Sequence, residues 1–172
     1  AQPRIGLWNL YALADALGPL IGHPDITRAL VDDHFTPTFD AHFAQRMRAR
    51  LGLATPLPGD ADFIGATLGL LQLERIDYTL FFRALSSLPG AVLRESRALI
   101  DAPLRDLFAD REACDAWLLG WRARLAREGS RDAVRQPAMR AVNPRYVLRN
   151  WMAESAIRRA RDGDFGEVRG LL

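Results

Sequence analysis

The chain has 172 residues, of which 49% are hydrophobic, enough for one well-packed domain and too few for two of ordinary size. Its 23 basic residues are all arginine, its 21 acidic residues leave a net charge of only +2, and the two signs are interspersed, so we expect no nucleic-acid partner. No run of about 18 apolar residues and no signal-peptide pattern is present, so we expect no membrane association and a cytoplasmic location.

Apolar residues recur every three or four positions along most of the sequence, and alternating β-branched runs are nearly absent. This pattern predicts an all-α fold, a bundle-like array of about seven to nine helices. The sequence shows no internal repeat and no low-complexity linker. We therefore expect residues 1–172 to form a single helical domain.

Three helices are predicted in the first third of the chain. The first covers residues 7–21, where glycine and proline then end it, and the second covers residues 25–34. Pro37 is expected to open a third helix that Thr36 caps and that reaches Leu51. The predicted break between the second and third helices depends on Pro37 alone.

The middle of the chain contains two clear helix starts and one unclear region. A helix is predicted to begin at Asp60, and Asp77 is expected to cap a strongly apolar segment that ends before Pro89. No element is clear over residues 91–107. Residues 110–127 predict a further helix with a continuous apolar side.

Sequence signals predict both ends of the next helix, near the C-terminus. Asn143 is a good N-cap, Pro144 suits the first helical position, and Gly163 can take the left-handed conformation that ends a helix. A helix is therefore predicted over residues 144–162, with another starting near residue 165.

Two arginines of this predicted helix, Arg145 and Arg149, project into its apolar face. A buried guanidinium needs carboxylates or carbonyl oxygens as partners. We expect a structural ion pair inside a helical core, and an anion-binding role is the alternative.

No set of residues predicts catalysis or metal binding. The histidines His34 and His42 match no recognised metal-ligand pattern. Cys114 is the only cysteine, so no internal disulfide can form, and we expect its side chain to pack in the core. The serines lack a G-x-S-x-G elbow, and the sequence has no glycine-rich phosphate loop and no lysine. We therefore predict no catalytic, cofactor-binding or metal-binding residue in this chain.

Three separated segments resemble a known family. They read Gln-Pro-Arg-Ile followed by Trp-Asn at the start, Asp-Tyr-Thr with Phe-Arg in the centre, and Asn-Pro-Arg-Tyr-Val-Leu-Arg-Asn near the end. The residues that carry this structural signature are Gln2, Pro3, Trp8, Asn9, Asp77, Tyr78, Arg83, Asn143, Pro144, Tyr146, Arg149 and Asn150. In this order the three segments resemble the C-terminal helical region of the SelO (selenoprotein O) family.

The resemblance implies a pseudokinase that transfers AMP from ATP to Ser, Thr or Tyr hydroxyls of proteins with the help of magnesium. In that family the nucleotide-holding and metal-binding residues precede the Gln-Pro segment. The parent protein would therefore be an enzyme, whereas this chain alone would hold neither ATP nor Mg and would be inactive.

The same resemblance implies that the chain corresponds to the C-lobe and C-terminal extension of a kinase-like fold. Its partners would be the upstream kinase-like lobe of the same protein and, for the parent, its protein substrates. Apolar surface left uncovered by that lobe would favour self-association. The alternative is a self-sufficient helical module that binds a protein or an anionic ligand through its arginines, without catalysis.

Overall fold

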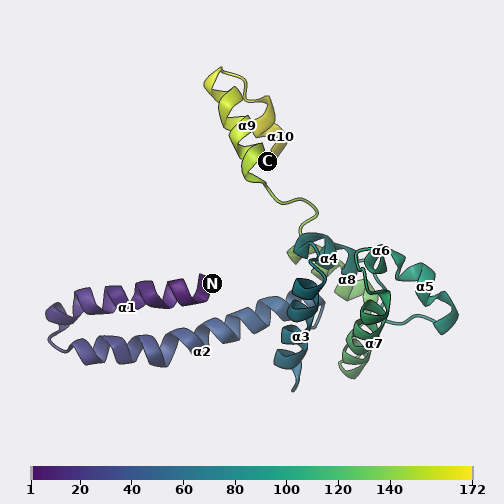
Figure 1. The fold of residues 1–172 in the computed structure, drawn as a ribbon, viewed down its shortest axis with the longest axis horizontal. Helices are drawn as coiled ribbons and strands as arrows, with labels where there is room; N and C mark the ends of the chain where they lie inside the picture. The colour runs from purple at the N-terminus through teal and green to yellow at the C-terminus, as the bar shows by residue number, and fades with distance from the viewer. Residues whose placement is uncertain (1, 172) are drawn as a thin grey trace.

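The computed structural model describes residues 2–171, which contain ten α-helices, one 3-10 helix and no strand (Figure 1). The all-α prediction is confirmed. Two of the helices, α5 and α6, are single turns of four residues each in the region where the sequence showed no clear element. The α-helices are α1 (Gln2–Ile21), α2 (Pro24–Leu51), α3 (Asp60–Leu73), α4 (Tyr78–Leu85), α5 (Arg97–Ile100), α6 (Ala102–Arg105), α7 (Arg111–Arg127), α8 (Asp132–Val142), α9 (Asn150–Arg161) and α10 (Gly166–Leu171), and the 3-10 helix covers Arg94–Ser96.

The helices form three spatial groups (Figure 1). α1 and the first half of α2 make an antiparallel arm, α3 to α8 surround the end of α2, and α9 with α10 stands apart at the end of an extended segment. In the arm, Arg28 and Asp15 form an ion pair at 2.6 Å, and the Thr27 hydroxyl donates to the carbonyl oxygen of Ala14 at 3.1 Å. No helix in the described part of the chain is both long enough and apolar enough to cross a membrane.

The hydrophobic core lies where α2 ends, between α3, α4, α6, α7 and α8. Aromatic side chains form its centre: the rings of Phe81 and Trp117 meet edge to face, with centroids 5.2 Å apart. The indole of Trp121 donates a hydrogen bond to the carbonyl oxygen of Leu51 at 2.9 Å, so the end of α2 is fixed to α7. Cys114 is fully buried in this core, as its position on the apolar side of α7 predicted.

Two predicted helix starts are confirmed in atomic detail. The Asp77 carboxylate accepts hydrogen bonds from the backbone N–H groups of Thr79 and Leu80 at 2.8 and 3.0 Å and thereby caps α4. Asp110 caps α7 by accepting from the N–H of Ala113 at 2.9 Å. Both carboxylates satisfy donors that the first helical turn leaves unpaired.

The predicted break at Pro37 is wrong, because α2 runs without interruption from Pro24 to Leu51. An internal proline removes one helical hydrogen bond and typically costs about 3 kcal/mol. In α2 the exposed ring of Pro37 lies in a stretch where Phe35, Phe39 and Phe43 stack one on the next, with centroids 6.0 and 5.9 Å apart. This aromatic ladder holds the turns on both sides of the proline together, and Thr36 is therefore a mid-helix residue and not a cap.

The predicted N-cap at Asn143 is also wrong. Asn143 is the C-cap of α8, with its N–H donating to the carbonyl oxygen of Met139 at 2.9 Å, and α9 begins only at Asn150. Residues 144–149 have no helical structure, in keeping with the bias of a residue before proline toward extended backbone. The end of the helix was predicted correctly: α9 stops at Arg161, and Gly163 has a φ of +86°.

The face of α9 that the sequence assigned to a core is only partly covered. Ala156 is buried and Met152, Ala153 and Ala160 are half-buried, but Ile157 is 56% exposed, and Leu148, just before the helix, is 60% exposed. Arg145 and Arg149 are exposed as well, so the expectation of two buried guanidinium groups is wrong. The physical reason is that residues 144–149 extend away from the core and carry α9 with them (Figure 1).

Candidate functional site

The structure brings together two of the three signature segments and leaves the third apart. The residues Asp77, Tyr78 and Arg83 belong to α4 and its cap, and Asn143 and Arg149 flank the extended segment after α8. Together with Arg50 and Ser86, which contact them, we call these residues the signature junction.

Asn143 is the centre of the signature junction and is only 1% exposed. Its side-chain amide donates to the carbonyl oxygen of Arg50 at 2.9 Å and to the Ser86 hydroxyl at 3.1 Å. Its carboxamide oxygen accepts from the Arg50 guanidinium at 3.4 Å. One side chain therefore connects the ends of α2, α4 and α8.

Arg83 of α4 contacts the C-terminal end of α8. Its guanidinium donates to the backbone carbonyl oxygens of Asn143 at 3.1 Å and of Arg140 at 3.4 Å. The last carbonyl groups of a helix have no partner within the helix and carry partial negative charge, so a cation there is favourable. Arg83 is half-buried, which limits competition from water.

Asp77 and Arg149 join α4 to the extended segment through an ion pair at 3.4 Å. The N–H groups of Leu80 and Thr79, followed by the charge of Arg149, hold the pKa of Asp77 below its ordinary value. Both side chains are more than 40% exposed, and exposed pairs of this kind contribute little to stability. The contact therefore sets the direction of the segment more than it adds stability.

The ring of Tyr78 packs against Phe82 and against the guanidinium of Arg50 on one side of the signature junction. The Tyr78 ring packs against Phe82 with centroids 4.6 Å apart, and the Arg50 guanidinium lies 5.3 Å from the centre of the Tyr78 ring. The Tyr78 hydroxyl donates to the sulfur of Met47 at 3.3 Å. Burial raises the pKa of Tyr78, so it remains a neutral packing residue at physiological pH.

The other signature residues lie outside the signature junction. Pro3 and Asn9 are exposed on α1, and Trp8 is 69% exposed there. The side chain of Gln2 lies outside the described residues. Pro144, Tyr146 and Asn150 are exposed in or after the extended segment.

The signature junction contains one carboxylate, no histidine and no cysteine, and its hydrogen bonds position the ends of α2, α4 and α8. Among residues 2–171, no group of three or more His, Cys, Asp and Glu side chains is placed to hold a metal ion. Sequence reasoning missed Arg50 and Ser86. Neither has a local signal, because each acquires its role through a partner more than 50 residues away.

Comparisons with known proteins assign the chain to a family. The family model described as protein adenylyltransferase SelO matches residues 1–172. The chain is 55% identical over 171 residues to the protein nucleotidyltransferase YdiU of Dechloromonas aromatica, and 46% identical over 171 residues to the YdiU proteins of Myxococcus xanthus and Herminiimonas arsenicoxydans. These matches cover 99% of this chain and 33 to 34% of each relative, so the chain spans about a third of the length of these curated relatives.

Proposed function

Because this chain belongs to the SelO family of protein adenylyltransferases, we propose that it is the C-terminal helical region of an enzyme that transfers AMP from ATP to Ser, Thr or Tyr hydroxyl groups of proteins. The observation that carries the proposal is the match of the family model to residues 1–172. High identity to proteins named as nucleotidyltransferases supports the same chemical class.

Among residues 2–171 no convergent carboxylate cluster is placed to hold a metal ion, and the whole sequence has no lysine. We propose that ATP and Mg bind in the part of the relatives' length that this chain does not match, in a kinase-like lobe. The need for ATP makes the cytoplasm the proposed location.

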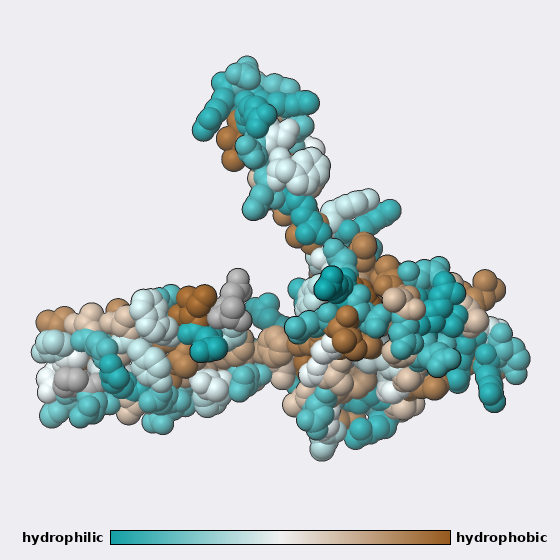
Figure 2. All heavy atoms as spheres, viewed as in Figure 1, coloured by the Kyte–Doolittle hydropathy of each residue, from teal (hydrophilic) through white to brown (hydrophobic). Residues whose placement is uncertain are grey.

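The proposed role of this chain is to support that lobe, and by itself the chain would be inactive. The signature junction supports this role because its hydrogen bonds connect three helix ends. Figure 2 shows hydrophobic side chains at the surface of the α1–α2 arm. In α1, Trp8 is 69% exposed and Leu20 is 84% exposed. Such a surface suits packing against the upstream lobe, and self-association of the isolated chain is expected in the absence of that lobe.

The proposal can be tested by joining this chain to the unmatched part of the Dechloromonas aromatica relative. We expect the joined protein to transfer labelled AMP from ATP to a protein acceptor in the presence of magnesium, and this chain alone to transfer none. Isothermal titration of the chain alone with magnesium and ATP should show no binding. Micromolar binding, or an inactive but folded joined protein, would contradict the proposal.

A further inference from the structure

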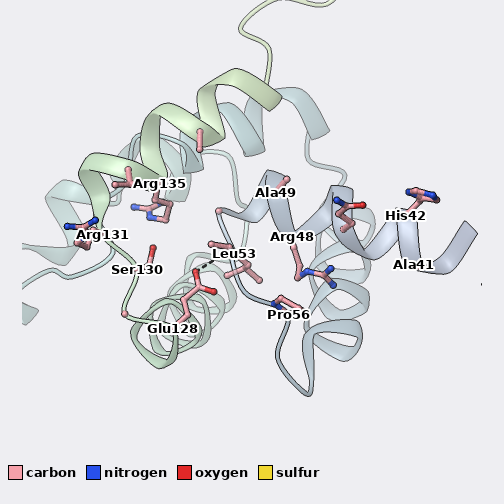
Figure 3. Close-up of a pocket in the computed structure, with 16 residues that line it drawn as sticks. Ala41, His42, Arg48, Ala49, Leu53, Pro56, Glu128, Ser130, Arg131 and Arg135 are labelled. Atoms are coloured by element: carbon pink, nitrogen blue, oxygen red, sulfur yellow. Dashed lines mark hydrogen bonds between the residues drawn. The ribbon is translucent and has the colours of Figure 1, made fainter. Parts of the chain in front are cut away.

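A groove of about 730 Å³ lies between the second half of α2 and the turn from α7 to α8 (Figure 3). This volume falls within the range of about 300 to 1,000 Å³ typical of ligand sites in proteins. No signature residue lines it. We propose that this groove binds an acidic peptide segment of a partner protein, with an apolar side chain on the groove floor and carboxylates on Arg48 and Arg131.

The positive charge of the groove comes from two arginines without partners. Arg48 comes from α2 and Arg131 immediately precedes α8, so they lie on opposite walls (Figure 3). Neither guanidinium makes a hydrogen bond or ion pair with another residue in the described part of the chain. Arg122 and Arg124, by contrast, have carboxylate partners at 2.6 and 2.7 Å.

The acidic groups near the groove are already hydrogen-bonded within the protein. Glu128 lines the groove, but its carboxylate accepts from the N–H groups of Ala54 and Thr55 at 3.1 Å and from Arg124 at 3.0 Å. The charge of Arg48 acts on the Asp60 carboxylate, but that carboxylate accepts its hydrogen bonds from Arg124 and from the N–H of Leu57. The guanidinium groups of Arg48 and Arg131 therefore remain available on the two walls to hydrogen-bond a ligand.

The floor between the two arginines is apolar. Ala49 of α2 and Val134 of α8 face the opening from the two sides, and Leu53 lies below them and is buried. The two helices meet beneath the groove only because residue 52 is glycine. A Cβ atom there would lie 2.5 Å from the Met139 sulfur and 2.8 Å from Cγ of Arg135, and its φ is +76°.

A peptide with an apolar side chain between two carboxylates complements this surface. The carboxylates would form charge-assisted hydrogen bonds with the two guanidinium groups, which bind carboxylates in a fork geometry. A nucleic acid fits less well, because no Phe, Tyr or Trp lines the groove and, among the described lining residues, His42 alone offers an aromatic ring for a base. The inference does not depend on AMP transfer, and its test needs no nucleotide.

The test is fluorescence anisotropy of this chain with a capped, fluorescein-labelled peptide of sequence Gly-Asp-Leu-Leu-Asp-Gly. We expect it to bind at least about tenfold more tightly than the same peptide with Asn in place of Asp, since hydrogen bonds to charged groups are the stronger ones. Arg48→Gln and Arg131→Gln should each weaken binding about tenfold, and Ala49→Phe should weaken it similarly by filling the groove. Circular dichroism melting curves identify any variant that has lost its fold.

Arg127→Gln is the matched control, because Arg127 is an exposed arginine of α7 that does not line the groove. It removes the same charge and should leave affinity within about twofold, as expected of a rim or remote charge. Equal weakening by Arg127→Gln would show unspecific attraction and overturn the proposal. Absence of binding, indifference to Ala49→Phe in a folded protein, or tighter binding of a labelled oligothymidine would overturn it as well.

Discussion

The side-chain amide of Asn143 donates a hydrogen bond to the backbone carbonyl oxygen of Arg50, 93 residues earlier in the sequence, at 2.9 Å. The same nitrogen reaches the Ser86 hydroxyl. Because all three residues lie at helix ends, the contact determines how α2, α4 and α8 meet. It also gives a structural reason for an asparagine at the start of the Asn-Pro segment.

Replacing Asn143 with alanine should lower the free energy of unfolding by about 1 to 3 kcal/mol, because a buried carbonyl and a buried hydroxyl lose a partner. Urea denaturation followed by circular dichroism measures this change. Asn150→Ala is the control, since Asn150 is exposed, and it should stay within about 0.5 kcal/mol. Equal effects of the two substitutions would show that the buried hydrogen bonds contribute nothing.

The buried ion pair between Arg122 and Asp101 should be far more sensitive to substitution than an exposed one. Arg122 donates to both carboxylate oxygens at 2.7 and 2.6 Å, and the two side chains are 9% and 3% exposed. Asp101→Asn leaves a buried guanidinium without its counter-charge and should cost about 3 to 5 kcal/mol in urea denaturation. Glu154→Gln, in the exposed pair with Arg158, should cost less than about 0.5 kcal/mol. A similar loss in both variants would contradict the dependence on burial.

The carboxylate of Asp60 should make the folded protein less stable in acid. Burial alone would raise its pKa, but the hydrogen bonds from Arg124 and from the N–H of Leu57 outweigh burial and hold the pKa below the ordinary value of 3.8. A lowered pKa contributes stability that is present above pH 3.8 and is lost as the pH falls through the folded-state value. The unfolding free energy of the wild type should therefore drop from pH 7 to pH 3 more steeply than that of Asp60→Asn.

Asp62→Asn is the control for this acid effect, because Asp62 lies on the same helix and is exposed. Its pH dependence should match that of the wild type. A flat pH profile in Asp62→Asn, or a wild-type slope in a folded Asp60→Asn, would assign the acid sensitivity to other groups.

Cys114 should be chemically inert in the folded protein. It is fully buried, and burial together with the charge of Asp115 raises its pKa to about 12, so the reactive thiolate is scarce. Iodoacetamide at pH 8 should modify it only after unfolding in urea, as measured by intact-mass spectrometry. Rapid modification of the native chain would mean that α7 opens locally without global unfolding.

Gly52→Ala should destabilise the fold by more than about 1 kcal/mol, because an alanine would adopt a left-handed conformation and its Cβ would collide with Met139. Gly65 offers the opposite case, since it lies inside α3 and a Cβ there would meet nothing within 4 Å. Gly65→Ala should stabilise the helix by about 0.5 to 1 kcal/mol. Thermal melts of the two variants should therefore shift in opposite directions, and shifts in the same direction would contradict this reading of Gly52.

The sequence predicted those parts of the fold that local chemistry determines. α3, α4 and α7 begin where Asp60, Asp77 and Asp110 indicated, since a cap and an apolar face act within a few residues. The break at Pro37 was wrong because an aromatic ladder along α2 opposes it. A single proline was therefore a poorer guide to a helix end than the aromatic residues spaced four apart around it.

The errors near the C-terminus have a different cause. Asn143 resembles an N-cap locally, but its hydrogen bonds go to Arg50 and Ser86, which no local pattern connects to it. The apolar face of α9 was predicted correctly as a face, but an amphipathic pattern says nothing about where its partner lies. Of the signature junction, the resemblance identified Asp77, Tyr78, Arg83, Asn143 and Arg149. Their meeting point required the three-dimensional structure.

The extended segment 144–149 determines how far α9 can act. Six residues span at most about 20 Å, and the single side-chain contact to α4 along this segment is the exposed pair of Arg149 and Asp77 among the described residues. Because this segment links α9 to Asn143, α9 is present at a millimolar effective concentration near any surface within that radius. A contact with a Kd well below that concentration would therefore be largely formed within one chain, even where separate molecules at micromolar concentration would seldom form it.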